Sequence, residues 1–204
     1  MQAGGPPNRI EAKSIVTLMF VTGSPDKAVE VSRILGVPVQ TQDFALAEVQ
    51  AVELEDVIRQ KAEYARTLLA GRTVLVEDTG LFIEAWAGLP GALTKWFVAR
   101  VGPGGICAML TTFGSRQAVA KTVVAVHDGE LHLFTGTVAG EIAFKPAGDR
   151  GFGFDAIFVP QGDTKTFAQM LPHEKDRYSM RRVAFEKMRA DYIDQPHGRG
   201  ARET

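Results

Sequence analysis

The sequence predicts an α/β protein, and three observations support this fold class. A nearly continuous apolar stretch at residues 15–21 is typical of a strand buried on both faces, and helix signals follow it directly. Residues 117–144 are rich in β-branched and apolar side chains around an Asp-Gly turn signal, which indicates an antiparallel hairpin. The chain has 204 residues, of which 45% are hydrophobic and 23% charged, as expected of one domain or one domain in two lobes.

The first strand and the helix after it are predicted from adjacent signals. Residues 15–21 are too few for a membrane span, which needs roughly 20 apolar residues, and no signal-peptide cleavage pattern follows them. Ser24 can cap a helix, Pro25 suits its first position, and Gly36 ends it. A second strand is predicted at residues 37–41.

A second helix and a third strand lead to a pair of carboxylates. Apolar residues recur at helical spacing over residues 55–70, which predicts a helix there. The strand predicted at residues 73–77 delivers Asp78 at its carboxyl end. A turn at residues 79–80 would bring Glu77 and Asp78 together to the rim of a cleft.

The second half of the chain contains the antiparallel pair and several shorter elements. We predict a loop at residues 88–91, helices around 95–100 and 106–113, a glycine-aromatic loop at 151–155, a strand at 156–160 and a helix at 178–193. Residues 1–13 are expected to form a flexible leader and residues 195–204 a flexible tail.

Charge and cysteine content exclude several classes of protein. The formal net charge is −1, so no global attraction to nucleic acid or to an anionic membrane is expected. Cys107 is the single cysteine and cannot form an intrachain disulfide, which fits a reducing compartment. We therefore expect a cytoplasmic protein that binds any anionic ligand through a local cluster of cations.

Residues 22–27 join the first strand to the first helix, and this connection suits a phosphate. Backbone N–H groups without helical partners and the positive end of the helix dipole meet there. Lys27 lies in the first turn, where its charge opposes the dipole, and a bound anion would relieve that local cost. The connection is not a Walker A loop, and similar turns also occur with a purely structural role.

The carboxylates of Glu48, Glu77 and Asp78 are candidate metal ligands. Magnesium prefers hard oxygen ligands and usually takes one or two carboxylates, with water and substrate phosphates completing its octahedron. A solvated strand end would explain the same residues without a metal, so this pattern leaves both interpretations open.

The loop at residues 151–155 reads Gly-Phe-Gly-Phe-Asp and is a candidate site for a flat ligand. Glycine lets the backbone approach closely, a phenylalanine ring offers a stacking face, and a carboxylate can accept a hydrogen bond from a base. A bulge whose rings fill the core is the alternative. Lys175 and Arg181 follow at the start of the last predicted helix.

Taken in order, these motifs resemble the inosine triphosphate pyrophosphatase family over roughly residues 16–192. The resemblance rests on Thr22-Gly-x-x-x-Lys27, on Val76-Glu-Asp-Thr-Gly-Leu81 with Gly88-Leu-Pro-Gly91 and Lys95-Trp-Phe97, on Gly151-Phe-Gly-Phe-Asp155 with Ile157-Phe-Val-Pro160 and Thr166-Phe-Ala168, and on Lys175 with Ser179-x-Arg181. It implies an elongated mixed sheet flanked by helices, with residues 14–194 forming one two-lobed domain, a nucleotide cleft between the lobes, and a homodimer.

The resemblance also implies an activity and its residues. The family hydrolyses deaminated purine nucleoside triphosphates (ITP, dITP, XTP) to the monophosphate and pyrophosphate and so cleanses the nucleotide pool. Glu48 and Asp78 correspond to its magnesium ligands, and Asp78 is also the candidate general base. The substrate would be bound by Thr22, Gly23, Ser24, Lys27, Lys61, Thr79, Lys95, Phe152, Gly153, Phe154, Asp155, Lys175 and Arg181.

Base selection follows from hydrogen-bonding patterns. A 6-oxopurine presents a donor at N1 and an acceptor at O6, whereas adenine presents the reverse, so Asp155 near N1 and Arg181 near O6 would favour inosine or xanthosine. Two positions depart from the family pattern. Ser24 stands where the family commonly has Asn, and Met180 stands where it has His, which replaces a polar contact at the base with a thioether.

Two alternatives remain beside deaminated purines as substrates. Because of Met180, the same scaffold could act on other modified nucleotides. A nucleotide-binding regulator without catalysis is the other alternative, which the joint presence of Lys27, Asp78, Lys175 and Arg181 argues against. A nucleic-acid-binding module is not expected, because the chain lacks a basic run inside its globular region.

Overall fold

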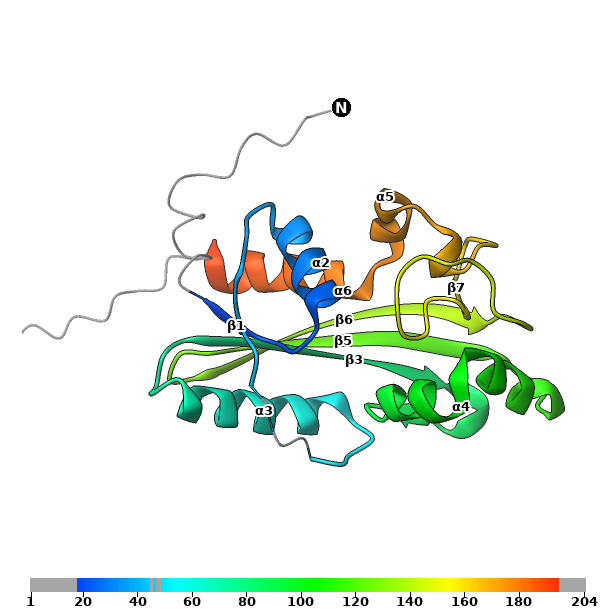
Figure 1. The fold of residues 1–204 in the computed structure, drawn as a ribbon, viewed down its shortest axis with the longest axis horizontal. Coiled ribbons are helices and arrows are strands. Elements are labelled where there is room, and N and C mark those ends of the chain that lie inside the picture. The colour runs from blue at the N-terminus through cyan, green and yellow to red at the C-terminus, as the bar shows by residue number, and fades with distance from the viewer. Residues whose placement is uncertain (1–17, 45, 47–48, 195–204) are drawn as a thin grey trace, which may run out of the picture.

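A seven-stranded mixed sheet forms the centre of the protein, and helices cover both of its faces (Figure 1). The computed structural model describes residues 18–44, 46 and 49–194. The predicted fold class, an elongated mixed sheet flanked by helices, is confirmed. The expected leader at residues 1–13 and tail at residues 195–204 lie outside the described residues.

The sheet has the strand order β2-β1-β3-β5-β6-β7, with β4 paired to β3 outside this path. The strands β2, β1 and β3 are parallel, whereas β3, β5, β6 and β7 pair antiparallel. Their bounds are β1 Met19–Val21, β2 Gln40–Gln42, β3 Val74–Ile83, β4 Pro90–Gly91, β5 Gln117–His127, β6 Leu131–Ile142 and β7 Phe158–Pro160.

Helices α2 and α6 cover one face of the sheet, and α3 and α4 cover the other (Figure 1). The α-helices are α2 Pro25–Leu35, α3 Leu54–Leu68, α4 Thr94–Met109, α5 Pro172–Lys175 and α6 Met180–Met188. Short 3₁₀ turns lie at Glu84–Trp86, Leu110–Thr112, Phe167–Gln169 and Asp176–Tyr178, and a π-helical turn at Arg189–Ile193. None of the helices in the described part of the chain combines the length and apolar composition that a bilayer crossing requires.

Local signals set the ends of α2 as the sequence predicts. The Ser24 hydroxyl accepts a hydrogen bond from the Lys27 backbone N–H at 3.4 Å, Pro25 opens the helix, and Gly36 closes it at φ +71°. The apolar face of α2 packs with α6 on Leu75 of β3, while the neighbouring Val74 faces α3 on the other side of the sheet. This alternation fixes which face of β3 each later residue points to.

Strand β3 is longer than predicted, because it continues through Asp78 and Thr79 to Ile83. The prediction of a turn at residues 79–80 is therefore wrong. All ten residues of β3 pair with β5, from Val74 opposite His127 to Ile83 opposite Ala118. Long-range pairing thus overrides the local turn signal of Thr79-Gly80.

The two helices predicted around residues 95–100 and 106–113 occur as the two arms of α4 and the turn after it. They are separated by a break at Gly102, where the backbone adopts φ +75° and ψ 161°. The second arm begins earlier than predicted, directly after this glycine, because Pro103 suits the first position of a helix.

One edge of β3 is left open in its middle. Strand β1 pairs with β3 only at Val74 and Leu75, and β4 pairs with the same edge only at Leu81 and Phe82. Residues 76–80 therefore have a strand neighbour, β5, on one edge alone. The candidate site lies at this opening.

Candidate active site

A cleft of about 440 Å³ opens at the free edge of β3. Its walls come from the turn before α2, from β3, from the starts of α4 and α6, and from the loop before β7. All the residues that the family resemblance assigns to the site line it except Glu48, which lies outside the described residues. Glu77, the other candidate metal ligand, is buried and does not line the cleft. The lining residues are Thr22, Gly23, Ser24, Lys27, Lys61, Asp78, Thr79, Thr94, Lys95, Val98, Ala99, Phe152, Gly153, Phe154, Asp155, Lys175, Met180 and Arg181.

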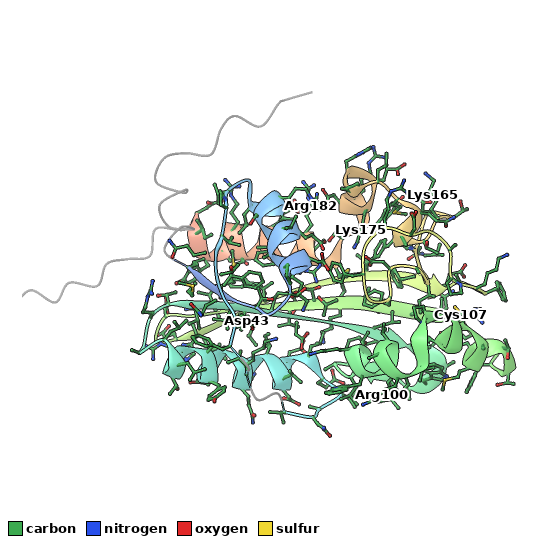
Figure 2. All side chains as sticks on the ribbon, in the orientation of Figure 1. Asp43, Arg100, Cys107, Lys165, Lys175 and Arg182 are labelled. Atoms are coloured by element: carbon green, nitrogen blue, oxygen red, sulfur yellow. The ribbon has the colours of Figure 1, made fainter. Side chains whose placement is uncertain are left out.

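One end of the cleft is formed by the turn that begins α2. Here the Ser24 backbone N–H donates to the Thr22 hydroxyl at 3.1 Å, which shapes the turn. Gly23 lies against Asp43, on the segment after β2 (Figure 2), and a Cβ at position 23 would lie 2.8 Å from Asp43 Oδ1. The N-terminus of α2 therefore faces the cleft with its positive dipole end, an arrangement suited to an anion.

Lys27 connects this turn to the carboxylates of β3. Its Nζ lies 2.6 Å from Glu77 Oε1 and 3.7 Å from Asp78 Oδ1. Lys61, from α3, donates from Nζ to the Glu77 carbonyl at 3.4 Å. Lys95 adds a further cation from the first turn of α4, so this end of the cleft combines one partly exposed carboxylate, Asp78, with three lysines.

A buried charge cluster lies beneath the cleft. The Arg181 guanidinium contacts Glu30 of α2 at 2.6 Å and Glu77 at 3.2 Å, and it donates to the Thr79 hydroxyl at 3.2 Å. Burial by itself would raise the pKa of the Glu77 carboxyl, but the charges of Arg181 and Lys27 outweigh it and lower the pKa from 4.5 to about 2. Glu77 therefore stays ionised as part of the scaffold.

The other end of the cleft is built around Asp155. Its Oδ2 accepts from the Phe152 backbone N–H at 2.9 Å and lies 2.8 Å from Lys175 Nζ. Gly151 adopts φ +74°, and a Cβ there would meet Asp155 Oδ2 at 2.0 Å, so glycine is required at this position. Lys175 lies between α2 and the loop before β7 (Figure 2).

The two phenylalanines of this loop have different roles. Lys175 Nζ and Arg181 Cζ lie 5.4 Å and 5.6 Å from the centre of the Phe152 ring, so that ring borders the cleft between two cations. Phe154 is 6% exposed and packs edge-on against Phe158 in the core. The core-filling alternative therefore holds for Phe154, whereas the Phe152 ring lines the cleft.

Asp78 is the described residue best placed to hold a metal ion. Its carboxylate is partly exposed in the cleft, and Oδ1 accepts from the Thr79 backbone N–H at 2.9 Å. Among the described residues no group of three or more His, Cys, Asp or Glu side chains could hold a metal. One or two carboxylates suffice for magnesium bound together with phosphates, so Asp78 with a second oxygen ligand fits this ion.

The sequence analysis did not single out Glu30 or Thr94. Glu30 follows Lys27 by one helical turn, and the signal that could have found it is an acidic residue beside the apolar face of α2. Thr94 accepts from the Leu81 backbone N–H at 2.8 Å and donates to the Gly91 carbonyl at 2.6 Å. Thr94 therefore fixes the start of α4 against β3, and no local sequence pattern predicts this contact.

Comparisons of the sequence and of the structure with known proteins agree with one another. A family model described as the Ham1 family matches residues 18–191. The chain is 43% identical to a dITP/XTP pyrophosphatase of Thermococcus kodakarensis, over 80% of this chain and 90% of that protein. It is 36% identical to an inosine triphosphate pyrophosphatase of Schizosaccharomyces pombe, over 87% and 95%. A crystal structure of a nucleoside-triphosphatase / dITP/XTP pyrophosphatase from Mycobacterium abscessus is similar at 28% identity and a TM-score of 0.68, over 84% and 97%.

Proposed function

The chain belongs to the Ham1 family, and from this premise we propose that it hydrolyses deaminated purine nucleoside triphosphates (ITP, dITP and XTP) to the nucleoside monophosphate and pyrophosphate. The observation that carries the proposal is the single cleft, which joins a lysine-rich end at the start of α2 to an aromatic end at Phe152 and Asp155. The protein is thus a hydrolase of nucleotide metabolism, and removal of deaminated nucleotides from the pool is its proposed role.

The charges of the cleft favour a polyphosphate that arrives with a cation. Among the described lining residues are five cations, and the carboxylates of Asp78 and Asp155 lie beside them. Glu30 and Glu77 compensate two of those cations from below. The remaining positive charge is small beside the roughly four negative charges of a triphosphate. Magnesium is therefore the proposed cofactor; bound near Asp78 and, by family resemblance, Glu48, it would neutralise phosphate charge.

Asp78 is the proposed general base. The Thr79 N–H donates to one carboxylate oxygen, and Lys27 Nζ lies 3.7 Å from the same oxygen, so the carboxylate is held in a fixed orientation. Asp78 would accept a proton from water while the water oxygen bonds to the α-phosphorus. The bond from that phosphorus to the bridging oxygen breaks, and pyrophosphate leaves with both electrons of the bond. No covalent enzyme intermediate is needed.

Asp155 and Arg181 are the proposed readers of the base. Arg181 has five N–H donors, of which three are used by Glu30, Glu77 and Thr79, so donors remain for the O6 of a 6-oxopurine. Asp155 can accept from N1–H, since a carboxylate has more acceptor positions than its two present contacts use. The Phe152 ring would stack on the base.

Met180 favours a second candidate substrate class. Its side chain lines the cleft, is 2% exposed, and brings no hydrogen-bond donor to the base end. Discrimination between bases then depends on fewer polar contacts, so other modified nucleotides are the alternative substrates on the same scaffold. A panel of ITP, XTP, GTP, ATP, their deoxy forms and alkylated analogues would separate the two classes.

The experiment that tests the reaction is pyrophosphate release from this panel with Mg²⁺ and with EDTA. Asp78→Asn should lower kcat by about 10³-fold while ITP binding is retained, because the variant keeps the shape of the group but not its basicity. Asp191→Asn, which changes an exposed carboxylate after α6, is the matched control. A fully active Asp78→Asn protein would refute the assignment, and no turnover of any nucleotide by the wild type would refute the function.

A homodimer and a cytoplasmic location are also proposed. Trp96, Met109 and Phe113, in and after α4, are 52%, 47% and 44% exposed, and these side chains are the proposed dimer contact. Light scattering of the purified chain would test the dimer. The single cysteine, buried Cys107, is consistent with a reducing compartment.

A further inference from the structure

Helix α2 presents three charged side chains at a spacing of three residues, Lys27, Glu30 and Arg33. Each pairs with a different part of the protein. Lys27 pairs with Glu77 of β3 and Glu30 with Arg181 of α6, and both belong to the site described above. Arg33 pairs with the carboxylate of Asp176, in the 3₁₀ turn that follows α5.

In the Arg33–Asp176 pair the arginine is 38% exposed, and only its carboxylate partner is largely buried. The side chain of Asp176 is 13% exposed, and its Oδ1 is buried without a hydrogen-bond partner within the described structure. Arg182 interacts with this carboxylate only electrostatically, because its own guanidinium is hydrogen-bonded to Glu186. Arg33 is therefore the cation that contacts this partly buried carboxylate directly.

The segment that Asp176 belongs to cannot fix its own position. Helix α5 has four residues, and a helix of one turn is not stable by itself. Tyr178 packs against the core at one end of the segment, and Glu174 caps the backbone of α5 at the other. Between them lies Lys175, next in sequence to Asp176, whose ammonium contacts Asp155 and the Phe152 ring at the base end of the cleft.

We infer that Arg33 is a positioning residue for the base end of the cleft. By holding Asp176 it fixes the segment that carries Lys175 against α2, the helix whose N-terminus forms the phosphate end. The base end of the cleft is thereby held in a fixed position relative to the phosphate end. This inference rests on the proposed function, because it concerns the same cleft.

The prediction is a selective loss of affinity for ligands that reach the base end. In Arg33→Met, the KM for ITP and the inhibition constant of IMP should rise about 5-fold, the scale of a partly exposed ion pair, with kcat changed less than about 2-fold. Inorganic tripolyphosphate, which lacks a base, should inhibit the variant and the wild type equally. A general loss of stability would not separate these two inhibitors.

A double-mutant cycle and a matched control complete the test. Asp176→Asn should reproduce the effect, and the Arg33→Met/Asp176→Asn protein should be no worse than either single variant if the pair acts as a unit. Arg189→Met is the control, because Arg189 has similar exposure, 33% against 38%, and pairs with Asp194 at the other end of α6. Its IMP and tripolyphosphate constants should both match those of the wild type.

The outcomes separate this inference from the proposed function. If the wild type hydrolyses ITP while IMP inhibition is unchanged in Arg33→Met, or if both inhibitors weaken equally, the positioning role is refuted and the function stands. If the wild type neither hydrolyses ITP nor binds IMP, the function fails and the inference fails with it.

Discussion

Replacing Glu77 by glutamine removes the buried negative charge that Arg181 and Lys27 share, and its consequence for stability can be worked out from the structure. The Glu77 side chain is fully buried, 2.6 Å from Lys27 Nζ and 3.2 Å from Arg181 Nε. The variant keeps the size of the side chain and removes its charge. Both cations then lose a partner at a site from which water is largely excluded.

The size of the expected change in stability follows from the pKa of Glu77. Burial raises it, the nearby cations outweigh burial, and the folded-state pKa is about 2 against 4.5 for an ordinary glutamate. Because the folded-state pKa is the lower one, the ionised group stabilises the fold fully above about pH 4.5, and this contribution is lost as the pH falls through about 2. The difference corresponds to about 3 kcal/mol at neutral pH and to about half of that at pH 3.

Urea unfolding of the wild type and Glu77→Gln between pH 7 and pH 3 tests this reasoning. The difference in the free energy of unfolding should be about 3 kcal/mol at pH 7 and shrink by about half at pH 3. Glu53→Gln is the control, because that side chain is 62% exposed and 3.9 Å from Lys121, and it should change stability by less than about 0.5 kcal/mol. If the free energies of unfolding of wild type and Glu77→Gln differ by the same amount at both pH values, the claim that the ionised Glu77 stabilises the folded state is refuted.

Two further predictions concern α6. In Gly136→Ala the new Cβ would lie 2.0 Å from the Met180 carbonyl oxygen and 2.6 Å from the Ala184 backbone N, so thermal unfolding should show that the free energy of unfolding falls by more than about 2 kcal/mol. Gly114→Ala is the control, because a Cβ at position 114 would meet no atom within 4 Å, and it should be near neutral. Equal stability of the two variants would contradict the packing argument. Met180→His restores a polar group at the base end and should raise the ratio of kcat/KM for ITP over ATP by about 5-fold; an unchanged ratio would show that position 180 does not read the base.

Elements that depend on neighbouring residues were predictable from the sequence. Helix α2 begins and ends as its signals require, because Ser24, Pro25 and Gly36 act within one turn of the helix end. The hairpin of β5 and β6 likewise follows from its turn at Asp128-Gly129. The full length of β3 could not be predicted in this way, since its pairing with β5 depends on residues more than thirty positions away.

The candidate site was predictable as a set of motifs but not as a charge network. The resemblance named most of the lining residues, though not Thr94, Val98 or Ala99, and the structure brings all the described residues that it named to one cleft. Their roles in binding and catalysis stay predictions. The partners of Arg181 were not foreseen, because Glu30 lies 151 positions away and is joined to it only in the folded chain. The sequence also could not tell which of Phe152 and Phe154 fills the core, since each follows a glycine in the same short loop.

The open edge of β3 explains why these polar residues are where they are. Backbone groups of alternate residues point to that edge, where β1 and β4 leave no strand to pair with residues 76–80. Side chains take the place of the missing strand, because Lys61 donates to the Glu77 carbonyl and Asp78 accepts from the Thr79 N–H. The groups proposed for phosphate binding and proton transfer therefore also form hydrogen bonds with backbone groups at the open edge of β3. It follows that Asp78→Asn, whose amide oxygen can still accept that hydrogen bond, separates catalysis from folding better than Asp78→Ala would.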